Sequence, residues 1–175
     1  MHLNSKLHRI PIVPCLGKPI CDKTFISLSD MILHIENGVC TSGLNRSTIR
    51  KFAIQADRNN VITNPARLIR YSGDEEPRRY ATEQSRNQNG DYQCVLCPRT
   101  FLSLKSLNAH YASSVHEASV FRCPNHSAGC RKEFRTLSAV VQHIEDGQCG
   151  ALRSQYVKDR MGDLMKNMSN LRIAY

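Results

Sequence analysis

The chain has 175 residues and a formal net charge of +9, and hydrophobic residues make up 41% of it. Aromatic residues are only 6% and tryptophan is absent, which argues against a single large apolar core. The basic balance favours an acidic partner such as nucleic acid, and no stretch is apolar enough to span a membrane. Residues 1–6 lack the apolar run of a signal peptide, so we expect a nuclear or nucleo-cytoplasmic protein that is not secreted.

All eight cysteines fall into three copies of one spacing, and histidines complete each copy. The spacings are C-x5-C-x12-H-x5-C, C-x2-C-x12-H-x5-H and C-x6-C-x12-H-x5-C. The three sets are Cys15, Cys21, His34 and Cys40; Cys94, Cys97, His110 and His116; and Cys123, Cys130, His143 and Cys149. Twelve residues accommodate a returning strand and about two helical turns, which bring a histidine back onto a two-cysteine hairpin. The spacing therefore predicts three structural zinc ions, each with four protein ligands.

Apolar residues keep the same register in all three sets. A phenylalanine stands four residues after each second cysteine, and an aliphatic side chain follows six residues later. These pairs are Phe25 and Met31, Phe101 and Leu107, and Phe134 and Val140. Another apolar side chain precedes each first cysteine by two positions: Val13, Tyr92 and Phe121. The pattern predicts a small core between a hairpin and a helix in each copy.

These ligands and core positions resemble the Cys-Cys-His-His zinc-finger family, in which a two-stranded hairpin and one helix fold around zinc. The resemblance covers three stretches of about 30 residues each. The middle set fits the family pattern fully, whereas the outer sets replace the second histidine by Cys40 and Cys149. The expected fold class is small α+β zinc-stabilised modules: three ββα zinc fingers, numbered one to three here, with a helical connector and a C-terminal helix.

Fingers one and three repeat each other beyond their ligands. Residues 25–40 and 134–149 share the pattern Phe-x2-Leu-Ser-x4-His-Ile-Glu-x-Gly-x-Cys, which a duplication explains. This Gly-x-Cys ending is also similar to that of a group of uncharacterised fungal multi-finger proteins.

The glycine of this ending has a predicted structural role. Residues six apart on an ideal helix lie about 240° apart around its axis, so His34 and Cys40 cannot face one ion if the helix continues. Gly38 and Gly147 can adopt the left-handed conformation that ends a helix and returns the chain to the metal. Finger two has no such glycine, so its last turn before His116 is expected to widen or unwind.

The positive charge lies mainly outside the fingers. Residues 41–90 carry nine Lys and Arg against five Asp and Glu, and residues 150–175 carry five against two, whereas the fingers are nearly neutral. Family fingers read DNA through helix positions −1, 3 and 6. These positions hold Ser27, Asp30 and Leu33 in finger one; Ser103, Ser106 and Ala109 in finger two; and Thr136, Ala139 and Gln142 in finger three. Only glutamine is a good base reader, so sequence-specific DNA binding by the fingers is not favoured.

The ending of finger two suggests another nucleic acid. Its Leu107-x2-His110-x2-Ser113-x2-His116 pattern is similar to that of fingers that bind structured or double-stranded RNA, which read shape and phosphate. The same ending occurs in fingers used for protein contacts, and the polar residues of this helix can equally form a solvated face.

The connector divides into a helical part and a polar part. Ser47 is expected to cap a helix over residues 48–56, and Asn64-Pro65 to start another. We expect this part to pack on finger one, with a partner-binding helix as the alternative. Residues 72–91 are polar and charged, which predicts a flexible linker.

The tail predicts a basic amphipathic helix. Its apolar residues at helical spacing are Leu152, Tyr156, Met161, Leu164, Met168 and Leu171. The helix is expected to cover the back of finger three, and docking on another protein or on a membrane surface are the alternatives. The predicted organisation is finger one with its helical extension (1–71), linker (72–91), finger two (92–118), finger three (119–150) and tail helix (151–175).

The same residues allow two alternatives, a disulfide framework and a different ligand in the third set. A disulfide framework is disfavoured because we expect an intracellular protein. His126 follows Cys123 at ligand spacing and is an alternative to Cys130, but it abandons the twelve-residue interval that the three fingers share.

The predicted function is that of a nucleic-acid-binding regulatory protein for DNA or double-stranded RNA. An enzyme is the least favoured class, because four protein ligands leave zinc no open position for water or for a small-molecule substrate. The alternative is a zinc-stabilised protein–protein interaction scaffold, which the nearly neutral fingers favour.

Overall fold

The computed structural model describes residues 12–68, 79–126, 128–147 and 149–170. The chain forms two compact units. Unit one combines residues 1–70 with residues 119–175, and unit two consists of residues 71–118. Fingers one and three therefore belong to one unit, and finger two forms the other. The predicted consecutive modules did not include this association of segments that are distant in the sequence.

Each finger consists of two strands of two residues and a helix of nine. The elements are β1 (Val13–Pro14), β2 (Thr24–Phe25) and α1 (Leu28–Glu36) in finger one, β3 (Tyr92–Gln93), β4 (Thr100–Phe101) and α4 (Leu104–Ala112) in finger two, and β5 (Phe121–Arg122), β6 (Glu133–Phe134) and α5 (Leu137–Glu145) in finger three. All three hairpins are antiparallel and place the predicted apolar residue opposite the phenylalanine. The predicted α+β class with three ββα fingers is confirmed.

A hydroxyl group begins each finger helix. The side chains of Ser27, Ser103 and Thr136 accept hydrogen bonds from the backbone N–H groups of Asp30, Ser106 and Ala139, respectively. This is the usual N-cap geometry, which satisfies a donor that the first helical turn leaves unpaired. The three capping residues occupy helix position −1, which the family uses for base reading, so in this chain these side chains have a structural role within the finger.

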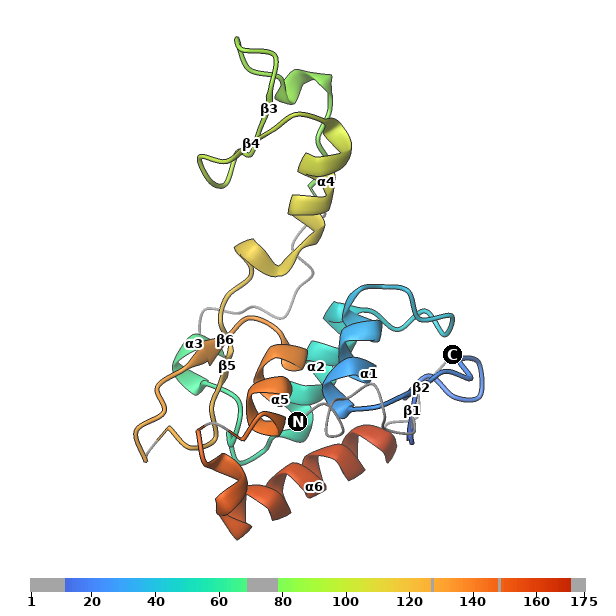
Figure 1. Ribbon diagram of the computed structural model, residues 1–175, viewed down its shortest axis with the longest axis vertical. Helices are drawn as coiled ribbons and strands as arrows, with labels where there is room; N and C mark the ends of the chain where they lie inside the picture. Colours follow the sequence, from blue (N-terminus) through green and yellow to red (C-terminus); the bar gives the residue numbers. More distant parts are fainter. Residues whose placement is uncertain (1–11, 69–78, 127, 148, 171–175) are drawn as a thin grey trace, which may run out of the picture. The chain divides into compact units, whose positions relative to one another are not determined.

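The core of unit one lies between α1 and α5, which pack against each other (Figure 1). Ile32 and Ile35 of α1 and Val141 and Ile144 of α5 are all buried. The corresponding positions of finger two hold Asn108 and Tyr111, both only partly buried. A buried aliphatic stripe therefore distinguishes the paired helices from α4.

The connector contributes a helix to unit one. Helix α2 (Arg46–Ala56) contacts α1, α5 and the tail helix, and it buries Ile49 and Ala53. The predicted cap was wrong: Asn45, rather than Ser47, accepts the hydrogen bond from the Thr48 N–H, so the helix begins two residues earlier than expected. The expectation that the connector packs on finger one holds for α2, which also contacts finger three.

After α2 the chain adds a third strand-like segment to finger three. Thr63 forms an antiparallel bridge with Phe121, and the backbone bonds Asn64 N–H to Val120 O and Arg122 N–H to Ile62 O flank it. The short helix α3 (Pro65–Leu68) then begins at the predicted proline. The connector thus ties finger one to finger three along the backbone.

The tail forms the predicted helix, but with a different buried face. After the 3-10 turn η5 (Ala151–Arg153), helix α6 (Gln155–Asn170) buries Val157 and Leu164 and contacts α2. Tyr156 is 58% exposed and Leu152 38% exposed, so these two residues were wrongly placed on the buried face. Val157 takes that position because it lies four residues before Met161 and seven before Leu164, on the same face of the helix. The Met168 side chain and Leu171 lie outside the described residues.

In unit two, the chain preceding finger two packs on that finger. Ala81 is buried and its N–H donates to Asn108 Oδ1, and the 3-10 turn η3 (Glu83–Ser85) brings Glu83 to the Tyr92 hydroxyl. Arg86 lies 5.2 Å from the centre of the Tyr92 ring. The predicted linker over 72–91 is partly outside the described residues, and the part from Ala81 onward belongs to the folded unit. None of the helices in the described ranges has the length and apolar character needed to cross a membrane.

Candidate metal centres

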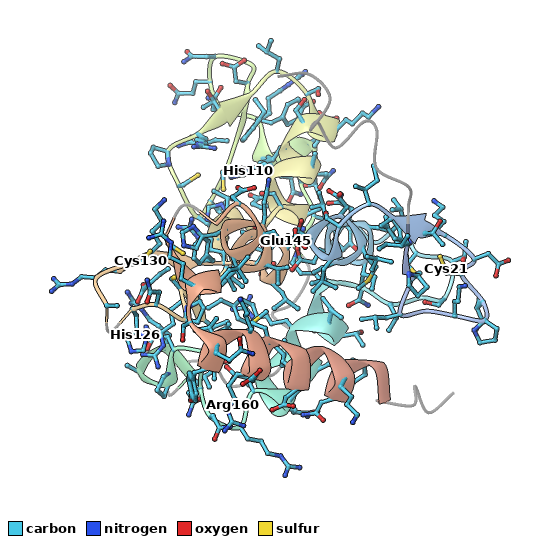
Figure 2. All side chains as sticks on the ribbon, turned by 60° about the horizontal axis from the view of Figure 1, so that its bottom comes forward. Cys21, His110, His126, Cys130, Glu145 and Arg160 are labelled. Carbon is cyan, nitrogen blue, oxygen red and sulfur yellow. The ribbon has the colours of Figure 1, made fainter. Side chains whose placement is uncertain are left out.

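The structure brings the twelve predicted ligands together as three clusters of four. They are Cys15, Cys21, His34 and Cys40 at site one; Cys94, Cys97, His110 and His116 at site two; and Cys123, Cys130, His143 and Cys149 at site three. The ligand atoms of each cluster lie within 4.8 Å of one another. All eight cysteines are free thiols, so the disulfide alternative finds no support. His126 belongs to none of the clusters found among the described residues (Figure 2).

The spacing of the ligand atoms tests whether the clusters fit zinc. Tetrahedral zinc with ordinary bond lengths places two sulfurs about 3.8 Å apart and a sulfur and a nitrogen about 3.5 Å apart. The two pairs Cys15–Cys40 and Cys123–Cys149 have Sγ–Sγ distances of 3.6 Å. The Sγ–Nε2 distance is 3.5 Å in each of the pairs Cys21–His34, Cys97–His110 and Cys130–His143. The three sites are therefore suited to structural zinc with four protein ligands.

The fourth ligand of each site comes from beyond the helix, by two different routes. Helices α1 and α5 end at Glu36 and Glu145, and Gly38 and Gly147 follow with φ of +68° and +67°. In finger two, α4 ends at Ala112, and a 3-10 turn, η4 (Ser114–His116), carries the second histidine. The prediction of a left-handed glycine in the outer fingers and of an unwound last turn in finger two is confirmed.

A phenylalanine supports the first histidine of every site. The Phe25–His34, Phe101–His110 and Phe134–His143 ring centres are 4.9, 4.8 and 5.1 Å apart, with the same interplanar angle of 38°. Burial lowers the pKa of His110 and of His143, which favours the neutral imidazole that binds zinc. The repeated phenylalanine thus orients a ligand as well as filling the core.

The first cysteine of each site accepts a backbone hydrogen bond. The donors to Cys15, Cys94 and Cys123 are the N–H groups of Gly17, Leu96 and Asn125, at 3.4, 3.4 and 3.3 Å from Sγ. In the absence of metal, burial raises the pKa of the Cys15 and Cys123 thiols to about 12. A metal ion must therefore displace protons from these thiols, and zinc affinity depends on pH.

Gly17 is a site residue that the sequence analysis missed. A Cβ atom at this position would lie 2.2 Å from Ser42 Oγ and 3.1 Å from Cys40 Sγ. The Ser42 hydroxyl in turn contacts Cys40 Sγ at 3.0 Å. Only glycine therefore leaves room for the chain to return to site one, and no spacing in the sequence marks this requirement.

Two glutamates that follow the ligand histidines join sites one and three. Glu36, at the end of α1, accepts hydrogen bonds from the N–H groups of Leu137 and Ser138 and from the Ser138 hydroxyl, all at the start of α5. Burial raises the pKa of Glu36, and these donors partly oppose the increase. The carboxylate of finger one thus caps the helix of finger three.

Glu145 makes the reciprocal contact. At the end of α5, it accepts from the N–H groups of Leu28 and Ser29 and from the Ser29 hydroxyl, and Figure 2 shows it between the two helices. The Leu-Ser and Glu of the repeated pattern are therefore contact residues between the fingers. Finger two has Lys105 and Ala112 in place of this Ser and Glu. The signal was present in the sequence as non-ligand residues that only the outer fingers share.

The tail covers the ligands of site three. Cys123, Ala151 and Val157 form one buried cluster, against which Cys149 and Met161 pack. The expectation that the tail helix covers the back of finger three agrees with these contacts.

Comparison with known proteins supports the finger assignment. Residues 92–116 match a family model described as a zinc-finger of C2H2 type. This stretch is finger two, the set that fits the Cys-Cys-His-His pattern fully. No curated protein and no solved structure matches the chain. Zinc binding is therefore supported by one family match and by three clusters of suitable geometry, and the similarity to fungal proteins stays a prediction.

Proposed function

We propose that this protein is a non-catalytic, nuclear or nucleo-cytoplasmic regulatory protein that binds nucleic acid through the basic surface of unit one. The observation that carries the proposal is the contact between α2 and α6, which joins the basic connector to the basic tail. Residues 1–70 and 119–175 hold 19 Lys and Arg against nine Asp and Glu, whereas residues 71–118 hold five against six. Unit one therefore accounts for the positive net charge, which attracts phosphate.

A groove lies where these two basic segments meet. It has a volume of about 350 Å³, and the end of α2, the following loop and α6 line it. Arg58, Arg160 and Lys166 are among its lining residues, and Figure 2 shows Arg160 on α6. Asp57 and Asp163 also line it, but Asp57 accepts three backbone N–H groups and Asp163 pairs with Arg160 at 3.4 Å. Arg58 and Lys166 are the cations that we expect to contact phosphate.

The finger helices favour recognition of phosphate and shape over base reading. The residues at position −1 are N-caps in all three fingers, and α1 and α5 contact each other through their buried faces. Duplex DNA and structured RNA both supply the required phosphates, and the resemblance of finger two to RNA-binding fingers keeps RNA among the candidates. Four protein ligands at each site leave zinc a structural role.

The test is binding of the zinc-loaded full chain to random-sequence DNA duplexes and to RNA hairpins at two salt concentrations. We expect zinc-dependent binding that weakens linearly with the logarithm of the salt concentration. The slope is that of the logarithm of the affinity against the logarithm of the salt concentration, and each phosphate contact contributes about 0.9 to it. The variant R58Q/K166Q should therefore reduce this slope by about two. The matched control R99Q/K105Q removes two exposed charges from finger two and should leave the slope unchanged.

A protein-interaction scaffold is the second candidate, and exposed apolar side chains on finger two favour it. Val95 is 71% exposed and Leu102 is 90% exposed. If the folded protein binds neither nucleic acid at low salt, this second candidate replaces the first.

A further inference from the structure

We infer that zinc sites one and three are thermodynamically coupled through the reciprocal carboxylate caps, whereas site two binds zinc independently. The inference concerns metal binding, so it stands apart from the proposed nucleic-acid function. It rests on the positions of Glu36 and Glu145, each of which belongs to one finger and caps the helix of the other.

The coupling begins at the metal, because zinc holds the end of each finger helix. In finger one, His34 lies on α1 and Cys40 returns to the site through Gly38. Ile32 and Ile35 hold α1 against α5, but finger one has only a small core of its own, so zinc contributes much of what fixes the end of this helix. Loss of zinc at site one therefore weakens the hold on Glu36 in the position in which it caps α5.

The consequence for finger three follows from burial. Ser138 and Glu36 are only 7% and 5% exposed, so the N–H of Leu137 and the hydroxyl of Ser138 lose a buried acceptor. Buried donors without an acceptor are costly, and an acidic group at a helix N-terminus is favourable. The start of α5, the helix that carries His143, becomes less stable, and with it zinc binding at site three.

The same connection runs in the opposite direction. Glu145 caps Leu28 and Ser29 of α1, so zinc at site three supports site one. Thermodynamic linkage requires that the two sites influence each other by the same factor. Finger two has Lys105 and Ala112 at the capping positions and lies in the other unit, so zinc binding at site two is not coupled to sites one and three.

The experiment measures zinc affinity at each site in the full chain, by chelator competition followed through the amide NMR signals of each finger. C21S disables site one, and we expect the affinity of site three to fall at least about fivefold, with site two unchanged. C130S should weaken site one by the same factor. C97S, which disables site two, should leave both other sites unchanged. Unchanged affinity of site three in C21S would overturn the inference.

A second pair of variants separates the caps from a general loss of structure. Glu36→Gln keeps the size of the side chain and every zinc ligand, and we expect it to weaken site three more than site one. Glu145→Gln should weaken site one more than site three, with a smaller effect because Glu145 is exposed. A carboxylate that only supported its own finger would show the opposite pattern in both variants, and that result would refute the coupling route.

Discussion

Gly147 shows how a single residue decides whether a ligand reaches its metal. Its φ of +67° lies in the left-handed region, where a side chain costs about 1–2 kcal/mol. No atom lies within 4 Å of the position that a Cβ atom would take, so the backbone alone resists substitution. The same holds for Gly38, the matching residue of finger one, with φ of +68°.

Substituting Gly147 therefore tests backbone strain separately from steric overlap. Gly147→Ala should lower the zinc affinity of site three about fivefold or more, equivalent to about 1 kcal/mol. Gly162→Ala is the matched control, because its Cβ also meets open space but the residue lies inside α6. There alanine should stabilise the helix by about 1 kcal/mol. Chelator competition measures the zinc affinity of site three in each variant, and thermal unfolding measures the stability. If Gly147→Ala lowered the zinc affinity of site three no more than Gly162→Ala does, the strain argument would be contradicted.

The ligand sets predict a difference in the pH dependence of zinc binding. Site three has to displace protons from three thiols, including Cys123 with a pKa raised to about 12, and site two from two thiols. Because binding releases protons, affinity falls as the pH falls below the ordinary thiol pKa of about 8.5. Between about pH 8 and pH 7, site three should lose about tenfold more affinity than site two.

Burial lowers the pKa of the histidine ligands His110 and His143, which favours the neutral form that binds zinc, so the thiols dominate the slope. The measurement is zinc competition with a chelator at several pH values, with both sites followed in one sample. Equal slopes would contradict the assignment of Cys149 as the fourth ligand.

At the scale of elements, Asp57 organises the connector after α2. Its carboxylate accepts the N–H groups of Val61, Ile62 and Thr63 at 2.8 to 2.9 Å. Ile62 and Thr63 are fully buried, and Thr63 forms the bridge to finger three. One acidic side chain thus holds the turn that directs the connector from finger one to finger three.

Removing this carboxylate should loosen the attachment. Asp57→Ala leaves three backbone donors without their acceptor, and we expect unit one to lose about 3 kcal/mol of unfolding free energy. The control Asp159→Ala removes an exposed carboxylate of α6 and should change the unfolding free energy by less than about 0.5 kcal/mol. Denaturant unfolding of the zinc-loaded protein gives both values. If the two variants were equally stable, the connector would not depend on Asp57.

The elements of the fingers could be predicted from the sequence, whereas those of the connector could be predicted only in part. The hairpins, helices and caps of the fingers follow from local spacing, because ligands, phenylalanine and capping hydroxyl lie within 30 residues of one another. The connector was harder to predict. Asn45 and Ser47 are both good caps, and only the reach of the Asn45 side chain to Thr48 N–H distinguishes them.

At the scale of the whole molecule, the chain returns to its first unit after passing through the second. Fingers one and three pack together although about a hundred residues separate them. All ligands of sites one and three lie in unit one, so we expect these two sites to bind zinc without unit two.

Replacing residues 71–118 by a Gly/Ser segment of equal length tests this independence. The protein with this replacement should bind two zinc ions, and the affinities of sites one and three should equal those of the intact chain within about twofold. Zinc stoichiometry and chelator competition provide the readout, and C97S in the intact chain is the control that empties site two alone. A loss of either remaining zinc would show that unit one depends on unit two.

The sequence by itself determined the zinc ligands, the miniature cores and the glycine endings. Each of these depends on contacts within one finger, where chain connectivity limits the possible partners. The sequence also contained the repeated serine and glutamate of the outer fingers, Ser29 and Glu36 and Ser138 and Glu145. A repeat alone does not reveal whether its residues contact each other. Only the tertiary structure decided that the outer fingers pair and that the basic connector meets the basic tail. Such contacts depend on how buried surfaces match across distant segments, which linear spacing does not record.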